Sequence, residues 1–192
     1  MTNNNNILTN KVYAFIWSRW SWKTMLSSII WKFKPYKKVY SNFELQYKNK
    51  EVIRYKDFDL YDKVKTTDLE KKLLIFDEGG INANSRNFAS KINKLLSFFI
   101  FVSRKYNIDI IFISQDFETF DKNIRRQTDF LFEIKSFLPK NIDATIWKME
   151  YWQKKFMIGT YSIDTLKLLE NYNIKYDTRD LSGFEEKLKT FF

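Results

Sequence analysis

The segment over residues 12–24 constrains the fold more than any other part of the 192-residue chain. Its first part, Val12 to Ile16, is apolar and predicts a short buried strand, and a helical pattern of apolar residues runs from Lys23 to Phe33. Between them the sequence reads Trp-Ser-Arg-Trp-Ser-Trp-Lys-Thr. With glycine in place of each tryptophan, this run would match the phosphate-binding loop G-x-x-x-x-G-K-[ST], which joins a strand to a helix.

This loop predicts a binding site for ATP and Mg²⁺. In such loops the backbone N–H groups surround the phosphates, the lysine reaches the β- and γ-phosphates, and the hydroxyl ligates Mg²⁺. The tryptophans conflict with this chemistry, because the main chain must bend through positive φ and approach the phosphates closely. The alternative is an ordinary helix that begins with Lys-Thr. The predicted nucleotide-binding residues of the loop are Trp17, Ser18, Arg19, Trp20, Ser21, Trp22, Lys23 and Thr24, with Thr24 as a Mg²⁺ ligand.

Two explanations account for the tryptophans. Either the protein carries them and is a decayed ATPase, or its gene reads UGA as glycine and the printed sequence translates UGA as tryptophan. We favour the second, because decay does not choose the same rare residue three times while it spares the catalytic residues. The chain also has only 4 glycines beside 6 tryptophans, whereas glycine usage averages roughly 7%. The second explanation predicts UGA codons for Trp17, Trp20 and Trp22, and also for Trp31, Trp147 and Trp152.

Two other predicted strands also end in polar residues. Residues 71–77 form the clearest strand, and its end, Asp77-Glu78, is typical of the acidic pair of a P-loop ATPase. There the aspartate supports Mg²⁺ and the glutamate activates the attacking water. Residues 109–114 form a second apolar strand that ends at Gln115, whose amide can contact the γ-phosphate. The alternatives are a pair of solvated acids and a surface glutamine.

Apolar strands that alternate with helical patterns predict an α/β fold, with a mostly parallel sheet covered by helices on both faces. Ligands of such sheets bind beyond the carboxyl ends of the strands. We therefore expect the loop, Asp77-Glu78 and Gln115 to meet at one edge of the sheet. Residues 1–10 are interpreted as a flexible arm and residues 11–192 as a single domain. The remaining predicted elements are strands at 39–45 and 130–134, helices at 88–106, 120–127 and 163–170, and a C-terminal β-hairpin formed by 145–151 and 155–161.

The net charge of +10, with neither histidine nor cysteine, favours a polyanionic partner, and nucleic acid is the first candidate. A solubilising basic surface is the alternative. The absence of both residue types excludes disulfides and argues against a zinc site. The polar N-terminus does not resemble a signal peptide, and the longest apolar run, Leu95 to Val102, is too short to cross a membrane. We therefore expect a soluble protein without direct membrane insertion.

Basic residues supply further candidates for contact with phosphate. Arg125, ahead of Arg126, is a candidate arginine finger that stabilises the transition state across a subunit boundary. Arg86 is a second candidate for a contact to phosphate or to a neighbour. The alternative for Arg125 is a basic helix face. A basic and aromatic cluster over residues 32–40 can bind a DNA backbone or simply be solvated.

Together these motifs resemble the additional-strand P-loop ATPases. Asp77-Glu78-Gly79-Gly80 with Asn84-Ser85-Arg86, and the stretch 103–115 with Phe120 to Arg125 after it, are similar to the zonular occludens toxin (Zot) N-terminal domain of phages. They also resemble the small viral genome-packaging ATPases of the HerA/FtsK superfamily. The resemblance covers about residues 10–135. It implies a RecA-like P-loop NTPase core in a homo-oligomeric ring, a hexamer, that uses ATP and Mg²⁺ to move DNA.

Three functions follow from the resemblance. The first is a viral genome-packaging motor, located in the host cytoplasm or with the virion, because the chain lacks the membrane segment that Zot proteins tend to carry. The second is a Zot-like phage assembly ATPase that extrudes DNA. Capsid or phage assembly proteins are the implied partners in these two cases. The third is a catalytically dead nucleic-acid-binding fold, if Trp17, Trp20 and Trp22 are real.

Overall fold

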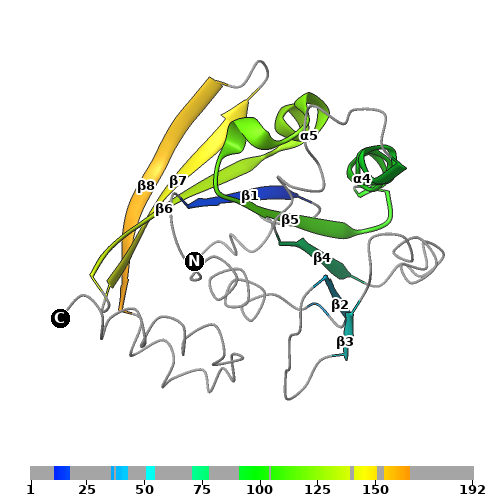
Figure 1. Ribbon diagram of the computed structural model, residues 1–192, viewed down its shortest axis with the longest axis horizontal. Helices are drawn as coiled ribbons and strands as arrows, with labels where there is room; N and C mark the ends of the chain where they lie inside the picture. Colours follow the sequence, from blue (N-terminus) through cyan, green and yellow to red (C-terminus); the bar gives the residue numbers. More distant parts are fainter. Residues whose placement is uncertain are drawn as a thin grey trace, which may run out of the picture.

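The computed structural model describes residues 11–17, 36, 38–42, 51–54, 71–77, 91–103, 105–138, 141–150 and 154–164. These residues form one twisted sheet of eight strands with helices packed against it (Figure 1). The strands are β1 Val12–Trp17, β2 Lys38–Ser41, β3 Glu51–Arg54, β4 Lys72–Phe76, β5 Ile108–Ser114, β6 Phe130–Leu138, β7 Asn141–Glu150 and β8 Lys154–Asp164. The helices are α4 Lys91–Val102, α5 Lys122–Gln127 and the short 3₁₀ helix η3 Phe117–Thr119.

The sheet is parallel over six strands and antiparallel over the last two. The strand order is β3-β2-β4-β5-β1-β6-β7-β8, and every pair from β3 to β6 is parallel. The β6–β7 and β7–β8 pairs are antiparallel, because the last three strands follow one another directly in the chain. The predicted α/β class, the mostly parallel sheet and the C-terminal hairpin are therefore confirmed. The edge strand β3 was not predicted, since residues 46–70 carry no clear apolar period.

The described helices share one hydrophobic core with the sheet. Leu96, Phe99 and Val102 of α4 are buried in a cluster that includes Phe112 of β5 and Ile124 of α5. Figure 1 shows α4 and α5 above the same region of the sheet. The central strands β4 and β5 are buried along their whole length. Burial on both faces explains why residues 73–76 and 110–113 are continuously apolar rather than alternating, although each strand also buries one charged residue, Lys72 or Asp109.

Two of the predicted helices differ from the structure at one end. The helix expected over residues 88–106 includes α4, but α4 ends at Val102. There the chain turns through Asn107, whose φ of 58° is a left-handed conformation that asparagine tolerates. The helix expected from residue 163 was wrong at its start, since Ile163 and Asp164 pair with Ile142 and Asn141 as the end of β8. The rest of that helix, the helix at 23–33 and the arm at 1–10 lie outside the described residues.

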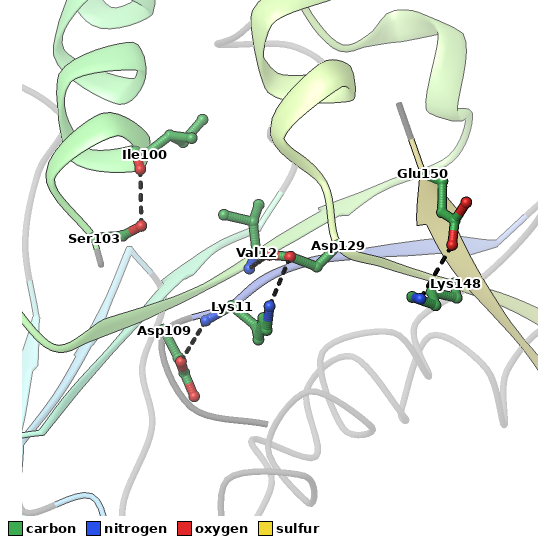
Figure 2. A network of polar contacts seen from close by, with 8 residues as sticks. All are labelled: Lys11, Val12, Ile100, Ser103, Asp109, Asp129, Lys148 and Glu150. Atoms are coloured by element: carbon green, nitrogen blue, oxygen red, sulfur yellow. Dashed lines mark hydrogen bonds and ion pairs between the residues drawn. The ribbon is translucent and has the colours of Figure 1, made fainter. Parts of the chain in front are cut away.

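Polar contacts join the amino ends of β1, β5 and β6 (Figure 2). The Lys11 backbone N–H donates to Asp109 Oδ1 at 2.7 Å, and the Val12 N–H donates to Asp129 Oδ2 at 2.9 Å. Lys11 Nζ lies 3.0 Å from Asp129 Oδ1. Burial, with the nearby carboxylates of Asp109 and Asp129, raises the pKa of Tyr13. These contacts bind β1 to both of its neighbours at one end, and therefore set which residues are level at the other end.

Candidate nucleotide-binding edge of the sheet

The strand order brings three of the predicted site residues to the same edge. β5 lies between β1 and β4, and all three strands run in the same direction. Ile16 pairs with Ser114, so Trp17, the last residue of β1, is level with Gln115, which directly follows β5. Phe76 pairs with Phe112, so Asp77 lies on the other side of β5, two residues lower along the strands. The expected convergence is confirmed for the described residues Trp17, Asp77 and Gln115.

The other predicted residues of this edge lie outside the described part of the chain. These are the metal and catalytic candidates Thr24 and Glu78, the phosphate-binding Lys23, and the remainder of the loop, Ser18, Arg19, Trp20, Ser21 and Trp22. The structure fixes the point where the chain enters the loop, because Trp17 still pairs with Ile134 of β6. Asp77 is the one predicted Mg²⁺ ligand that the described residues include, and these residues contain no cluster of three acidic side chains that could hold a metal alone.

Asp77 is held at its backbone by a residue that the sequence did not single out. The Asp77 N–H donates to Asn42 Oδ1, and Asn42 Nδ2 donates to the Asp77 carbonyl oxygen, both at 2.9 Å. Asn42 immediately follows β2, the strand that pairs with β4. One amide side chain therefore satisfies both backbone groups at the point where β4 ends. These two hydrogen bonds, the Asn42 clamp, hold the Asp77 backbone in place. They do not involve the Asp77 carboxylate. The strand predicted over residues 39–45 wrongly included Asn42, and asparagine, which is depleted in strands, was the signal in the sequence that β2 ends before it.

Gln115 projects from a tightly fixed turn. Ser114 Oγ lies 3.0 Å from Thr119 Oγ1, and the Asp116 side chain caps η3 by accepting from the Glu118 N–H at 3.1 Å. Gln115 itself is exposed, and its amide makes no hydrogen bond in the described structure. A fixed backbone with an exposed amide at the strand end is the arrangement that a contact to a bound phosphate or water requires.

Arg125 is paired within its own chain. Its guanidinium forms an ion pair and hydrogen bond with Glu118, while its Nε is buried and has no partner. α5 begins with its cap at Asp121 and returns the chain toward the amino ends of the strands, where the Asp129 N–H donates to the Val12 carbonyl oxygen at 2.8 Å. Arg125 therefore lies on the segment that leads from the carboxyl end of β5 back to the amino end of β6. Its neighbour Arg126 is exposed, and Arg86 lies outside the described residues.

The family model for the zonular occludens toxin (Zot) matches residues 35–179, well over half of the 192-residue chain. The chain belongs to the Zot family. The match begins after the tryptophan-rich loop, so family membership does not depend on how residues 17–24 are read. A search of curated proteins returned no match.

Solved structures agree with the Zot assignment at the level of the fold. The N-terminal domain of zonular occludens toxin from Neisseria meningitidis superposes with a TM-score of 0.62 and 17% identity, over 85% of this chain and 98% of that one. The genome packaging NTPase B204 from Sulfolobus turreted icosahedral virus 2, in complex with ATPγS, gives 0.55 and 11%, over 77% and 96%. The DNA-packaging ATPase B204 from Sulfolobus turreted icosahedral virus gives 0.55 and 12%, with the same coverage. The fold is therefore that of the P-loop NTPases.

The described helices of this Zot-family chain are short, and the longest, α4, has 12 residues. Within the described ranges, none is both long enough and apolar enough to cross a membrane.

Proposed function

We propose that the protein is an ATP-hydrolysing motor that moves DNA during virus assembly. The observation that carries the proposal is the position of β5, which separates β1 from β4 and aligns the ends of all three strands at one edge. This is the arrangement expected of an additional-strand ATPase, in which one strand supplies the phosphate loop, one the acidic pair and one the polar sensor. Membership in the Zot family and the likeness to packaging NTPases support it.

The residues at this edge divide the chemistry between them. Bound ATP supplies the phosphoanhydride bond, and Mg²⁺ neutralises charge on its phosphates. Lys23 holds the phosphates, and Thr24 and Asp77 hold the metal. Glu78 takes the proton of the attacking water, and Gln115 contacts the γ-phosphate or that water. The clamped backbone of Asp77 and the exposed amide of Gln115 fit these roles, because Asp77 is fixed at the end of β4 and Gln115 directly follows β5.

Arg125 completes the site of a neighbouring subunit in a ring of identical chains, a hexamer. A guanidinium that acts in trans must leave any partner within its own subunit, and Glu118, its partner here, is exposed and can release it into water. Arg125 therefore exchanges the Glu118 carboxylate for phosphate charge when a neighbour presents bound ATP.

The active protein carries glycine at residues 17, 20 and 22. Trp17 is the only one of these positions that the structure describes, and it stands where β1 ends and the main chain must turn toward phosphate. Trp147 differs from the loop residues. Its indole Nε1 donates to Glu133 Oε2 at 3.0 Å, and the ring packs against the core below Lys155 Nζ. These contacts favour tryptophan at residue 147, so the codons of the loop and of residue 147 need separate inspection.

A Glu78→Gln substitution in the chain with glycine at residues 17, 20 and 22 tests the catalytic proposal. We expect DNA-stimulated ATP hydrolysis to fall at least about 100-fold, the contribution of a general base, while ATP binding by fluorescence titration stays within a factor of two or so of the parent chain. Glu150→Gln on the exposed part of β7 is the matched control and should leave turnover unchanged. Undiminished turnover in Glu78→Gln would refute the role of Glu78.

The dead-fold alternative is tested by ATP binding to the printed sequence. If Trp17, Trp20 and Trp22 are native, their UGG codons will show it, and the chain will bind DNA but not ATP. If the codons are UGA, the glycine chain will bind ATP and the tryptophan chain will not, since the indoles fill the space that the phosphates need.

Two forms of DNA movement remain, packaging into a capsid and extrusion during phage assembly. The Zot family match, with the higher TM-score of the Zot domain, favours the extrusion form. Stimulation of ATP hydrolysis separates the two. A packaging motor responds to double-stranded DNA, whereas an extrusion ATPase responds to the single-stranded form.

A further inference from the structure

The segment that follows β5, residues 115–121, carries the predicted sensor Gln115 and is here named the Gln115 turn. On one side it is anchored in the core by Phe117 and Phe120, which are 7% and 0% exposed. The other side, which presents Gln115, is exposed and has no apolar anchor. The Thr119 hydroxyl contacts only the end of β5 and the turn itself. A further contact is therefore needed to hold the exposed side of the turn against the rest of the molecule.

The ion pair between Glu118 and Arg125 supplies this contact. It joins the carboxylate of Glu118, on η3, to the guanidinium of Arg125, on α5. Within residues 117–127, all of which the structure describes, it is the only hydrogen bond or ion pair between a side chain of η3 and a side chain of α5. Glu118 lies three residues after Gln115, so the ion pair ties the exposed side of the turn to the helix that follows it.

The helix that carries Arg125 is itself held by the sheet. Ile124 of α5 is fully buried in the core. Where the helix ends, the Thr128 hydroxyl donates to the Ile124 carbonyl oxygen at 2.9 Å. Directly after it, the Asp129 N–H donates to the Val12 carbonyl oxygen of β1 at 2.8 Å. The ion pair therefore connects the Gln115 turn to an element that the core and β1 already hold in place.

This ion pair differs from an ordinary pair of surface charges. Exposed pairs contribute little to stability, partly because two long side chains lose conformational freedom when they meet. The Arg125 side chain is only 18% exposed, and its Nε is buried without a hydrogen-bond partner, so packing already fixes its stem. The Glu118 side chain is 67% exposed, but its backbone N–H donates to Asp116 Oδ1 at 3.1 Å. Formation of the ion pair therefore restricts little more than the outer bonds of the Glu118 side chain.

We propose that Arg125 and Glu118 are positioning residues, which hold the Gln115 turn from within the same chain and so fix the Gln115 amide for its contact with the γ-phosphate or the attacking water. The proposal rests on the proposed function for what Gln115 contacts, whereas the hold on the turn does not depend on it. A displacement of about 1 Å at a reacting centre can cost about 100-fold in rate. Because Arg125 leaves Glu118 when it acts in trans, the same movement releases the turn of its own subunit.

Hydrogen exchange tests the hold on the turn in the full glycine-loop chain without nucleotide. Glu118→Ala removes the carboxylate, and Arg125→Met removes the guanidinium but keeps an unbranched stem. In each variant we expect the backbone amides of residues 115–121 to exchange about 2- to 5-fold faster, the effect of losing an ion pair of this kind. The double variant should exchange no faster than either single variant, because both substitutions remove the same contact. Unchanged exchange in either single variant overturns the proposal.

Glu150→Ala is the matched control, because Glu150 is also an exposed acid in an ion pair, with Lys148 Nζ at 3.1 Å. It should leave the exchange of residues 115–121 unchanged. Glu118→Ala and Glu150→Ala should both melt within about 4 °C of the parent chain, since both side chains are exposed. Faster exchange that extends evenly over α4 and β5 shows general destabilisation and overturns the proposal.

Steady-state kinetics tests whether the ion pair acts through Gln115. Glu118→Ala should lower the kcat of DNA-stimulated ATP hydrolysis by about 5-fold or more, while the KM for ATP stays within about a factor of two. In a chain that already carries Gln115→Ala, the same substitution should have no further effect, because the positioned group is gone. A kcat that is unchanged in Glu118→Ala, or that rises because Arg125 is freed to act in trans, overturns the positioning role. An effect that adds to that of Gln115→Ala also overturns it.

Failure of this proposal and failure of the proposed function give different results. Hydrogen exchange needs neither ATP nor DNA, and hydrolysis is measured on the same samples. A parent chain that does not hydrolyse ATP, but whose turn exchanges faster in Glu118→Ala, keeps the hold on the turn and refutes the motor. A parent chain that hydrolyses ATP, with exchange and kcat unchanged in Glu118→Ala, keeps the motor and refutes the positioning role.

Discussion

Replacement of Asn42 by alanine tests whether the end of β4 is held by tertiary hydrogen bonds. Asn42 donates one hydrogen bond to the Asp77 carbonyl oxygen and accepts one from the Asp77 N–H, each at 2.9 Å. A typical intramolecular hydrogen bond contributes about 0.5–1.5 kcal/mol to stability. Both residues are half-buried, so water can replace part of the loss. We therefore expect Asn42→Ala to lower the free energy of unfolding by about 1–2 kcal/mol.

Urea denaturation followed by circular dichroism measures this change in the free energy of unfolding. Thermal denaturation should show a fall of the melting temperature of about 3–6 °C for a chain of this size. Asn123→Ala is the matched control, because the Asn123 side chain is exposed and lies on α5. It should change the free energy of unfolding by less than about 0.5 kcal/mol.

The same substitution should also weaken binding of Mg-ATP by the glycine-loop chain. Asn42 orients a predicted metal ligand without touching the metal, and the loss of such a residue lowers affinity about 10-fold or more. Competition with a fluorescent nucleotide measures this, and Asn123→Ala again serves as the control. A stability equal to that of the parent chain, with equal Mg-ATP affinity, would contradict the reasoning, because it would show that the Asp77 backbone keeps its position without the clamp.

Three further predictions concern the amino edge and the gene. Asp129→Ala should lower the free energy of unfolding by about 2–3 kcal/mol in urea titration, because it leaves the buried Val12 N–H without its acceptor. Lys11→Met removes only the ion pair with Asp129, and should lower the free energy of unfolding by less than about 1 kcal/mol. Burial first, and then two nearby carboxylates, raise the pKa of Tyr13 above the unfolded value of 10.0, so its contribution to stability is complete below pH 10 and is lost as the pH rises further. Tyr13→Phe should therefore reduce the fall in unfolding free energy between about pH 10 and 11, and an unchanged slope would exclude this role. Sequencing the gene should give UGA at the three loop positions, and UGG there would remove the case for glycine.

The sequence predicted the strands that carry the site because their signal is local. Residues 73–76 and 110–113 are continuous apolar runs, and a strand buried on both faces needs no other pattern. The polar residues at their ends, Asp77 and Gln115, were predicted for the same reason. The hairpin of β7 and β8 was visible as two amphipathic stretches close together in the chain. β3 was missed because a four-residue edge strand within a polar segment carries too little periodicity.

The sequence by itself determined that this chain forms parallel strands with polar residues at their carboxyl ends, since those patterns span a few neighbouring residues. Only the tertiary structure decided that β5 lies between β1 and β4, that Asn42 clamps Asp77 from 35 residues away, and that Arg125 pairs with Glu118. These features depend on which strands pair and on which side chains then meet. Pairing is a competition among distant segments, and no local pattern records its outcome.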